Sequence, residues 1–273
     1  MSASLMPLIP EQRQQEILRV LRAQGVLGIR NLTDLLNVSH MTVRRDIAAL
    51  EESGLVTSVQ GGVRLADWTS REPPRERVSR AQLELPRKQA VAELGAGFVE
   101  DGMVIFLDAG TTCQSIVPFL RERKNVTVVT NDFYVVTSLF DYPNIETIHT
   151  GGLVDASSGS SCGRLAAQTL SSINLDLFFL STGTWSLPRG VTTPSLDKVE
   201  IKLAALKAAS ACFLLADSTK FCTVSKFLVA PLERLDAIVT DEELPVDAQD
   251  QIRGLGVNLH LAPVERSLSA TQD

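Results

Sequence analysis

Two adjacent arginines, Arg44 and Arg45, stand early in a segment whose apolar residues have helical spacing. Val43, Ile47 and Leu50 recur at positions i, i+4 and i+7, so they form one apolar stripe on the predicted helix. Arg45 then lies roughly opposite this stripe and Arg44 lies on its flank. Because an arginine can bond guanine or a phosphate through two parallel hydrogen bonds, this exposed face suits DNA recognition.

The first turn of the same helix carries further candidates. Ser39 stands where an N-cap belongs, and His40, Met41 and Thr42 follow it. Hydroxyls at a helix start can hold phosphate oxygens. The alternative is a winged helix that contacts other proteins, with the arginine pair as solvated surface. The chain has 26 basic and 32 acidic residues and a net charge of -6, so DNA binding would depend on local placement and on two copies of the helix.

A second group of candidates comes from polar turns that follow apolar runs. Asp108, Gly110, Thr111 and Thr112 follow the first run and open a helix, so their amides and hydroxyls could cradle a phosphate. Similar turns follow three later runs: Thr130-Asn131-Asp132, Thr150-Gly151-Gly152 and Asp217-Ser218-Thr219-Lys220. One such turn is usually only a turn, but four turns after four runs favour a binding site.

The elements that would position these turns alternate between strands and helices. The apolar runs are residues 103–107, 126–130, 145–149, 175–180, 211–216, 237–240 and 257–261. The helical stretches are residues 87–100, 115–123, 133–140, 164–172 and 195–210. This alternation predicts an α/β domain with a mostly parallel sheet covered by helices on both faces. Ligands in that architecture bind at the carboxyl ends of the strands.

The elements around the arginine pair predict a winged helix-turn-helix. Helices are expected at residues 11–24 and 31–36, and the turn 37–40 leads into the third helix. Residues 55–59 and 63–65 flank Gln60-Gly61-Gly62 and are typical of a hairpin with glycines at its turn.

Four segments follow from these patterns: a winged helix-turn-helix domain (1–67), a linker (68–85), an α/β domain (86–262) and a disordered tail (263–273). The linker is dense in charge and contains Pro73-Pro74. No run approaches the ~18 apolar residues of a membrane span, and no signal peptide is evident, so we expect a cytoplasmic protein. Four scattered cysteines and three histidines favour reduced thiols, no metal and no cofactor.

Residues 11–65 resemble the amino-terminal domain of the DeoR family of bacterial sugar-responsive regulators. The positions that match the family pattern are Arg13, Ile17, Leu18, Leu21, Val38, Ser39, Thr42, Arg44, Arg45, Asp46, Leu50, Gly54, Gly61 and Gly62. Gln60 takes the place of a frequent histidine. The resemblance implies that Ser39, Thr42, Arg44 and Arg45 face DNA, and we add His40, Met41 and the wing glycines Gly61 and Gly62 as candidates.

Residues 86–242 resemble the effector domain of the same family, whose fold is similar to ribose-5-phosphate isomerases and coenzyme A transferases. The implied ligand is a phosphorylated sugar or a related metabolite. Its candidate contacts are Asp108, Gly110, Thr111, Thr112, Thr130, Asn131, Gly151, Gly152, Gly183, Thr193, Glu200, Lys202, Asp217 and Lys220. Lys202 is included on the resemblance alone, since lysines on its predicted helix favour a solvated face.

The chain departs from the family at residues 181–185, Ser-Thr-Gly-Thr-Trp, where many relatives read Gly-Ala-Asp-Gly-Ile. An isomerase needs a positioned base, and this stretch has no carboxylate. Isomerase chemistry is therefore disfavoured, although Asp197, Glu200, Asp217 and Lys220 could supply acid and base groups. For Asp217 and Lys220 the alternative is a salt bridge at a strand end. Trp185 either lines a sugar site or packs in the interior.

These features predict a DNA-binding transcription regulator, a repressor of carbohydrate-metabolism genes, rather than an enzyme. Its partners would be double-stranded operator DNA and the small-molecule effector. A homodimer or homotetramer would place two recognition helices one DNA turn, ~34 Å, apart. The alternatives are a sugar-phosphate isomerase or transferase fused to a DNA-binding domain, and a winged-helix adaptor that binds no DNA.

Overall fold

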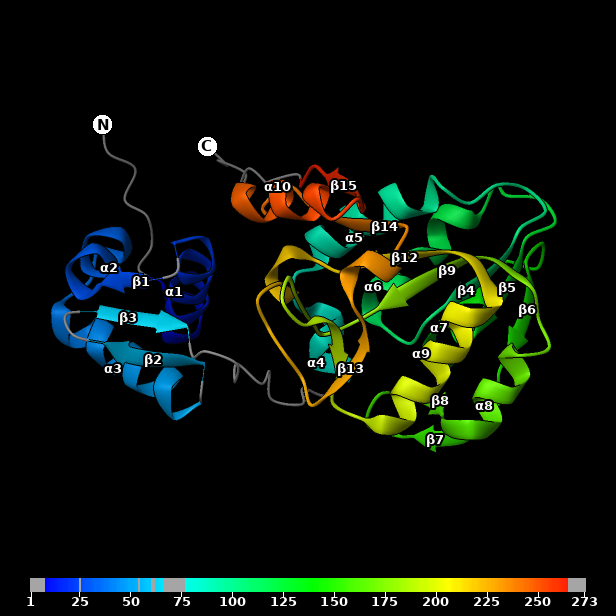
Figure 1. Cartoon of the computed structure of the whole chain (residues 1–273), viewed down its shortest axis with the longest axis horizontal. Coiled ribbons are helices and arrows are strands. Elements are labelled where there is room, and N and C mark those ends of the chain that lie inside the picture. Colours follow the sequence, from blue (N-terminus) through cyan, green and yellow to red (C-terminus); the bar gives the residue numbers. More distant parts are fainter. Residues whose placement is uncertain (1–7, 25, 54, 60–61, 66–76, 265–273) are drawn as a thin grey trace, which may run out of the picture. The chain divides into compact units, whose positions relative to one another are not determined.

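The computed structural model describes residues 8–24, 26–53, 55–59, 62–65 and 77–264. The described elements form two compact units, one before and one after the segment 66–76 (Figure 1). Gly61, most of the predicted linker and the tail from residue 265 lie outside the described residues. Within the described part, no helix is long and apolar enough to cross a membrane.

The first unit consists of three helices and a small antiparallel sheet. Its elements are α1 (Pro10–Gln24), β1 (Val26–Gly28), α2 (Ile29–Leu36), α3 (His40–Glu52), β2 (Val56–Val59) and β3 (Gly62–Leu65). The sheet order is β1-β3-β2, with β3 in the centre. The predicted winged helix-turn-helix is confirmed. The strand β1 was not predicted, because three residues between two helices are too short to show a period.

The core of this unit contains the apolar stripe of the predicted recognition helix. Val43, Ile47 and Leu50 are all buried, together with residues of α1, α2 and the sheet. Arg13 of α1 donates from Nε and Nη2 to the carboxylate of Asp46 on α3, at 2.7 and 3.1 Å. This paired contact fixes α3 against α1, so the opposite face of α3 is the one that remains exposed.

The second unit is built on a parallel sheet of seven strands. In sheet order they are β15 (Asn258–Ala262), β14 (Ala237–Asp241), β12 (Ala209–Leu215), β9 (Leu175–Ser181), β4 (Val104–Leu107), β5 (Thr127–Thr130) and β6 (Glu146–His149). Every neighbouring pair is parallel. Each of the seven predicted apolar runs forms one of these strands. The chain runs from β4 to β6 on one side and then returns to β9, so its direction across the sheet reverses between β4 and β9.

Helices cover this sheet and connect its strands. They are α4 (Arg77–Gln82), α5 (Leu85–Ala96), α6 (Thr111–Gln114), α7 (Phe133–Leu139), α8 (Gly163–Leu170), α9 (Leu196–Ala208) and α10 (Val246–Gly254), with 3-10 turns η1 (Val117–Leu120), η2 (Ser218–Lys220) and η3 (Leu232–Arg234). The single helix predicted at 115–123 is wrong. Two short pieces, α6 and η1, take its place, and Pro118 lies at the start of the second piece.

Two small antiparallel sheets were not predicted. One pairs β7 (Leu153–Asp155) with β8 (Ser160–Cys162), and the other has the order β10 (Thr184–Ser186), β11 (Gly190–Thr193), β13 (Phe227–Ala230). β7 and β8 follow β6 of the large sheet, β10 and β11 follow β9, and β13 follows β12. They therefore stand at the edge where the polar turns were expected.

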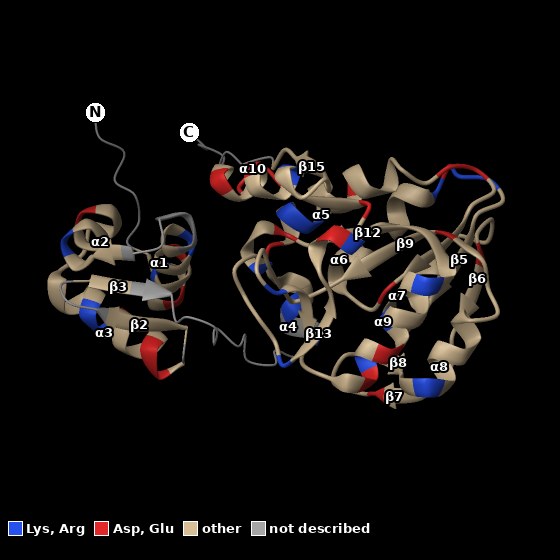
Figure 2. Cartoon of the chain, viewed as in Figure 1, with Lys and Arg blue, Asp and Glu red and all other residues tan. Residues whose placement is uncertain are grey.

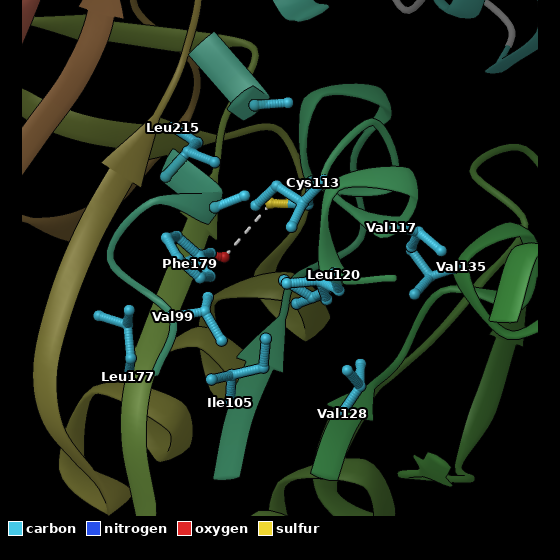
Figure 3. Packing of buried hydrophobic residues seen from close by; sticks show 14 of the residues in the cluster. Val99, Ile105, Cys113, Val117, Leu120, Val128, Val135, Leu177, Phe179 and Leu215 are labelled. Carbon is cyan, nitrogen blue, oxygen red and sulfur yellow. Dashed lines mark hydrogen bonds between the residues drawn. The ribbon is translucent and has the colours of Figure 1, made fainter. Parts of the chain in front are cut away.

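Apolar side chains from strands and helices meet beneath that edge (Figure 3). Ile105, Val128 and Phe179 from the sheet are fully buried in this cluster. Cys113 of α6 points into it, and its thiol donates to the carbonyl oxygen of Phe179 at 3.4 Å. Burial raises the pKa of the Cys113 thiol well above its ordinary value, so this cysteine is a core residue and not a nucleophile.

Candidate functional site

The exposed face of α3 carries the candidate DNA contacts. The side chain of Ser39 caps the helix: its Oγ accepts from the Thr42 amide at 3.2 Å and shares a hydrogen bond with Thr42 Oγ1. Arg44 and Arg45 are exposed, and within the described part of the chain neither has an ion-pair partner (Figure 2, blue on α3). Met41 is 70% exposed. Two cations and two hydroxyls thus face solvent on one short helix.

The wing glycine Gly62 has a packing role that the sequence did not reveal. A Cβ atom at this position would overlap the carbonyl oxygen of Leu27 in β1. Glycine is therefore needed for the close approach of β1 and β3.

In the second unit, Asp108 and Lys202 form a buried ion pair at the point where the sheet order reverses. Asp108 follows β4, and its Oδ2 contacts Lys202 Nζ of α9 and accepts from the Ser181 amide at 3.0 Å. Lys202 Nζ also donates to the Ser181 carbonyl at 2.7 Å. The exposed fractions of Asp108 and Lys202 are 1% and 5%. The structure thus brings two candidates from distant parts of the chain together with the end of β9.

The first two polar turns are joined by hydrogen bonds. The Ala109 amide donates to Asp108 Oδ1 and to Asn131 Oδ1, both at 2.9 Å. The Gly110 amide donates to Asp132 Oδ2 at 3.1 Å. A Cβ atom at Gly110 would lie 2.6 Å from Ser181 Cβ, so glycine allows the first turn to touch the end of β9. Thr130 Oγ1 donates back to the Leu107 carbonyl at 2.7 Å.

Asp132 lies at the centre of a cluster that sequence reasoning missed. Its Oδ1 caps α7 by accepting from the Tyr134 amide at 2.8 Å, and its Oδ2 contacts Arg77 Nη2 at 2.9 Å. Arg77 belongs to α4, inside the segment expected to be a linker. Burial raises the pKa of Asp132, while Arg77 and the amides of Tyr134 and Gly110 act in the opposite direction. The aspartate before a helix was a readable capping signal, whereas Arg77 carried none.

The third turn makes room for α8. Gly151 and Gly152 both have positive φ angles, 63° and 112°. A Cβ atom at Gly152 would lie 2.9 Å from the backbone nitrogen of Ala166. The Gly151 amide donates to His149 Nδ1 at 3.1 Å. These glycines shape the loop, and the first of them has open space beside its Cα.

The fourth turn contains a buried carboxylate oxygen without a hydrogen-bond partner. Asp217 Oδ1 accepts from the amide and the hydroxyl of Thr219, whereas Asp217 Oδ2 receives no hydrogen bond in the described structure. Asp217 is 1% exposed. Lys88 of α5 lies close enough for the charges of Asp217 and Lys220 to affect it, and burial lowers the pKa of Lys88 to about 8. Lys88 was also missed, because no pattern distinguishes it from a surface lysine.

The remaining candidates are dispersed. Thr193 is buried in β11, Gly183 is exposed, and Glu200 is exposed on α9 two positions from the buried Lys202. Trp185 is fully buried against Phe221, with ring centroids 4.8 Å apart, which supports the packing alternative. Within the described residues no group of three or more His, Cys, Asp or Glu side chains could hold a metal ion.

Comparison with known proteins matches both units to one family. The DeoR C terminal sensor domain matches residues 84–242, and the DeoR-like helix-turn-helix domain matches residues 13–69. An uncharacterized HTH-type transcriptional regulator of Haemophilus influenzae is 40% identical over 93% of this chain and 98% of that protein. The uncharacterized regulator YgbI of Escherichia coli is 41% identical over 88% of this chain and 93% of its own length.

A putative aga operon transcriptional repressor of Escherichia coli O157:H7 is 31% identical over 92% of this chain and 93% of that protein. Among solved structures, ribose 5-phosphate isomerase A of Methanocaldococcus jannaschii has a TM-score of 0.37 at 18% identity and covers 49% of this chain and 53% of that one. The family matches and the relatives agree with the winged helix and the parallel sheet described above. The chain belongs to the DeoR family of HTH-type transcriptional regulators.

Proposed function

We propose that this regulator represses carbohydrate-metabolism genes, and that a phosphorylated sugar or related metabolite bound at the carboxyl edge of the large sheet controls its affinity for operator DNA. One observation carries the effector site. The first and second turns, after β4 and β5, are hydrogen-bonded to each other and to the end of β9, at the reversal of the strand order. In open α/β sheets, ligands bind outside the carboxyl ends of the strands at this point.

The effector contacts we propose are the sequence candidates that line this edge. The hydroxyls of Thr111 and Thr112 open α6 beside the buried pair, and Asp217 presents an unpartnered carboxylate oxygen. A carboxylate can accept hydrogen bonds from sugar hydroxyls, and hydroxyl and amide donors suit a phosphate. The match to a sensor domain and the name of one relative, a putative aga operon transcriptional repressor, support the repression of an operon under the control of a bound effector.

We propose sensing rather than turnover. The stretch 181–185 offers no carboxylate, and Asp108 is engaged by Lys202 and two amides. A general base must be free to take a proton from the substrate. Asp217 does have a free carboxylate oxygen, so turnover of a sugar phosphate that is lost in Asp217→Asn would contradict this proposal. The protein would therefore act on DNA in the cytoplasm as a homodimer or homotetramer, because one short recognition helix covers only a half-site.

The DNA-binding proposal is tested with Arg45→Ala. DNA is first selected from a random pool by the wild-type chain and then used in gel-shift titrations. Loss of an arginine contact to a base or phosphate should weaken binding by about 1–3 kcal/mol, or ~5–150-fold. Arg19→Ala is the matched control, because Arg19 is an exposed arginine of α1 that pairs with Glu16. Equal affinity of Arg45→Ala and wild type would refute the assignment of α3.

The effector proposal is tested by thermal unfolding of the full chain against a panel of sugars, sugar phosphates and sugar acids. A ligand at 100 times its dissociation constant adds ~2.7 kcal/mol to the stability of the unit that binds it. We expect stabilisation by a phosphorylated compound and not by its unphosphorylated counterpart. Asp217→Asn should reduce the shift, whereas Asp250→Asn on the exposed face of α10 should not. No stabilisation by any compound of the panel would contradict the proposed site.

A further inference from the structure

Arg77 connects α4 to the proposed effector site. It is the first residue of α4, and α4 is the first described element after the DNA-binding unit. Its guanidinium contacts Asp132 Oδ2 at 2.9 Å, donates to Gln114 Oε1 at 2.9 Å and lies 4.7 Å from the centre of the Tyr134 ring. The side chain is only 4% exposed. A residue near the junction between the two units is therefore anchored inside the sensor unit.

The partner of Arg77 is shared with the first polar turn. Asp132 Oδ2 accepts from the Gly110 amide as well as contacting Arg77, and Asp132 Oδ1 accepts from the amide of Tyr134. One carboxylate thus joins α4, the turn before α6 and the first turn of α7. A ligand that accepts the hydrogen bond of the Gly110 amide removes one donor from Asp132 Oδ2. The ion pair between this oxygen and Arg77 must then change as well.

The other end of α4 is held by a second buried cation. Lys88 Nζ donates to the carbonyl oxygens of Arg80 and Leu83, the latter at 2.5 Å. A helix of six residues is not stable by itself in water. The docking of α4 therefore depends on the contacts of Lys88 and on the Arg77–Asp132 pair, and Asp132 also accepts from the first turn of the proposed effector site.

We propose that α4 is the element through which the effector site controls DNA binding, and that the Arg77–Asp132 ion pair is the contact that couples them. This inference rests on the proposed function. When an effector binds at the turn 108–112, the Gly110 amide donates to the effector in place of Asp132, and the ion pair of Asp132 with Arg77 changes. This change shifts α4 between a docked and a loosened state, and the two states have different affinities for operator DNA. α4 directly follows the segment that joins the two units in the sequence, so its docking fixes the point at which the chain enters the sensor unit. Allosteric coupling of this kind typically amounts to ~5–150-fold in affinity.

The first test measures DNA affinity in the absence of effector. Arg77→Gln, Asp132→Asn and the double variant are compared with wild type by fluorescence anisotropy, using DNA selected by the wild-type chain. Asn retains the capping ability of Asp132, so α7 should persist. We expect each single variant to change affinity at least ~5-fold in the same direction, and the double variant to match the single ones, because all three break one contact.

Arg123→Gln is the control, since Arg123 donates to the Ala96 carbonyl away from the polar turns. Affinities of Arg77→Gln and Asp132→Asn within twofold of wild type would overturn the inference. Failure of the wild-type chain to select any DNA would instead refute the proposed function.

The second test asks, without a ligand, whether a change in the first turn alters the docking of α4. It also tests the inference if Arg77→Gln fails to fold. Gly110→Ala forces the turn away from Ser181, whereas Gly110→Ala with Ser181→Gly restores the space. Hydrogen exchange of the α4 amides should be faster in the first variant and should return to the wild-type rate in the second. Unchanged exchange of α4 in Gly110→Ala would show that the turn and α4 are independent, and would overturn the inference.

Discussion

Replacement of Lys202 by methionine should destabilise the sensor unit strongly. The substitution keeps the length of the side chain and removes the ammonium group that contacts Asp108 and Ser181. Asp108 then keeps its two amide donors but loses its cation at a site that is 1% exposed. Because water cannot replace the missing partner, the charge of Asp108 remains buried and uncompensated.

The size of the effect follows from this burial. Removal of one partner of a buried ion pair costs about 3–5 kcal/mol, and the Ser181 carbonyl also loses a donor. Asp108→Asn should be costly for the reciprocal reason, since it leaves the ammonium of Lys202 buried without a carboxylate. The double variant removes both charges. Its cost should be well below the sum of the single costs, with an interaction energy of at least ~2 kcal/mol.

The assay is equilibrium urea unfolding of the full chain in a Trp68→Phe background. The sequence has two tryptophans, so Trp185, which is fully buried in the sensor unit, then provides the fluorescence signal alone. Lys198→Met is the matched control, because Lys198 lies on the same helix and pairs with Asp155 at 2.9 Å in a partly exposed position. Its loss should cost about 1 kcal/mol or less.

A cost of Lys202→Met no larger than that of Lys198→Met would refute the reasoning, as would strict additivity in the double variant. The outcome also bears on the effector. If Lys202 stabilises the fold through Asp108, a phosphorylated ligand should still stabilise the variant in the thermal assay. Loss of that response in a folded variant would place Lys202 in contact with the ligand.

Two further predictions concern the same edge of the sheet. Gly110→Ala should lower the free energy of unfolding by about 1–3 kcal/mol, because the added Cβ overpacks against Ser181. In urea unfolding, a second substitution Ser181→Gly should restore most of this loss. Ser181→Ala should restore less, because it leaves the overlapping Cβ in place. Lys88 has a pKa of about 8 in the folded chain and 10.5 in the unfolded one, so between these pH values the unfolded chain binds more protons. The free energy of unfolding of wild type, relative to that of Lys88→Met, should therefore rise from pH 8 to pH 10 by up to ~1.4 kcal/mol per pH unit. If the difference between the two proteins were constant over this range, the burial of the Lys88 ammonium would be contradicted.

The central strands β4, β5 and β9 were predictable because most of their residues are buried. Each reads as a short, mostly apolar run, which is typical of a central parallel strand. The edge strand β6 is more exposed, and polar residues interrupt its run. The strands β8 and β10 were not predictable for the opposite reason. Their residues, Ser160–Cys162 and Thr184–Ser186, are buried but mostly polar, so neither an apolar run nor an alternation marks them.

The site was predictable only as separate turns. Local spacing placed hydroxyls, glycines and carboxylates after strands, and parallel pairing brings those ends to one edge. The partners of each side chain come from the strand order, which no local pattern reveals. Asp108 and Lys202 are 94 positions apart, and Lys202 is the buried lysine on a helix whose pattern favours a solvated face. Arg77 was missed because its surrounding sequence has the charge density of a linker.

The first turn differs in one respect from a simple anion cradle. The amides of Ala109 and Gly110 already donate to Asp108, Asn131 and Asp132. An arriving phosphate therefore gains donors at this turn only from the residues that follow, or by exchange with a carboxylate. Exchange favours regulation, because a ligand shifts a conformational equilibrium only as far as it binds the two states differently. The first turn supplies that difference if its amides bond protein carboxylates in one state and ligand oxygens in the other. Because Asp132 Oδ2 also contacts Arg77, the loss of an amide donor at Asp132 changes the ion pair with Arg77.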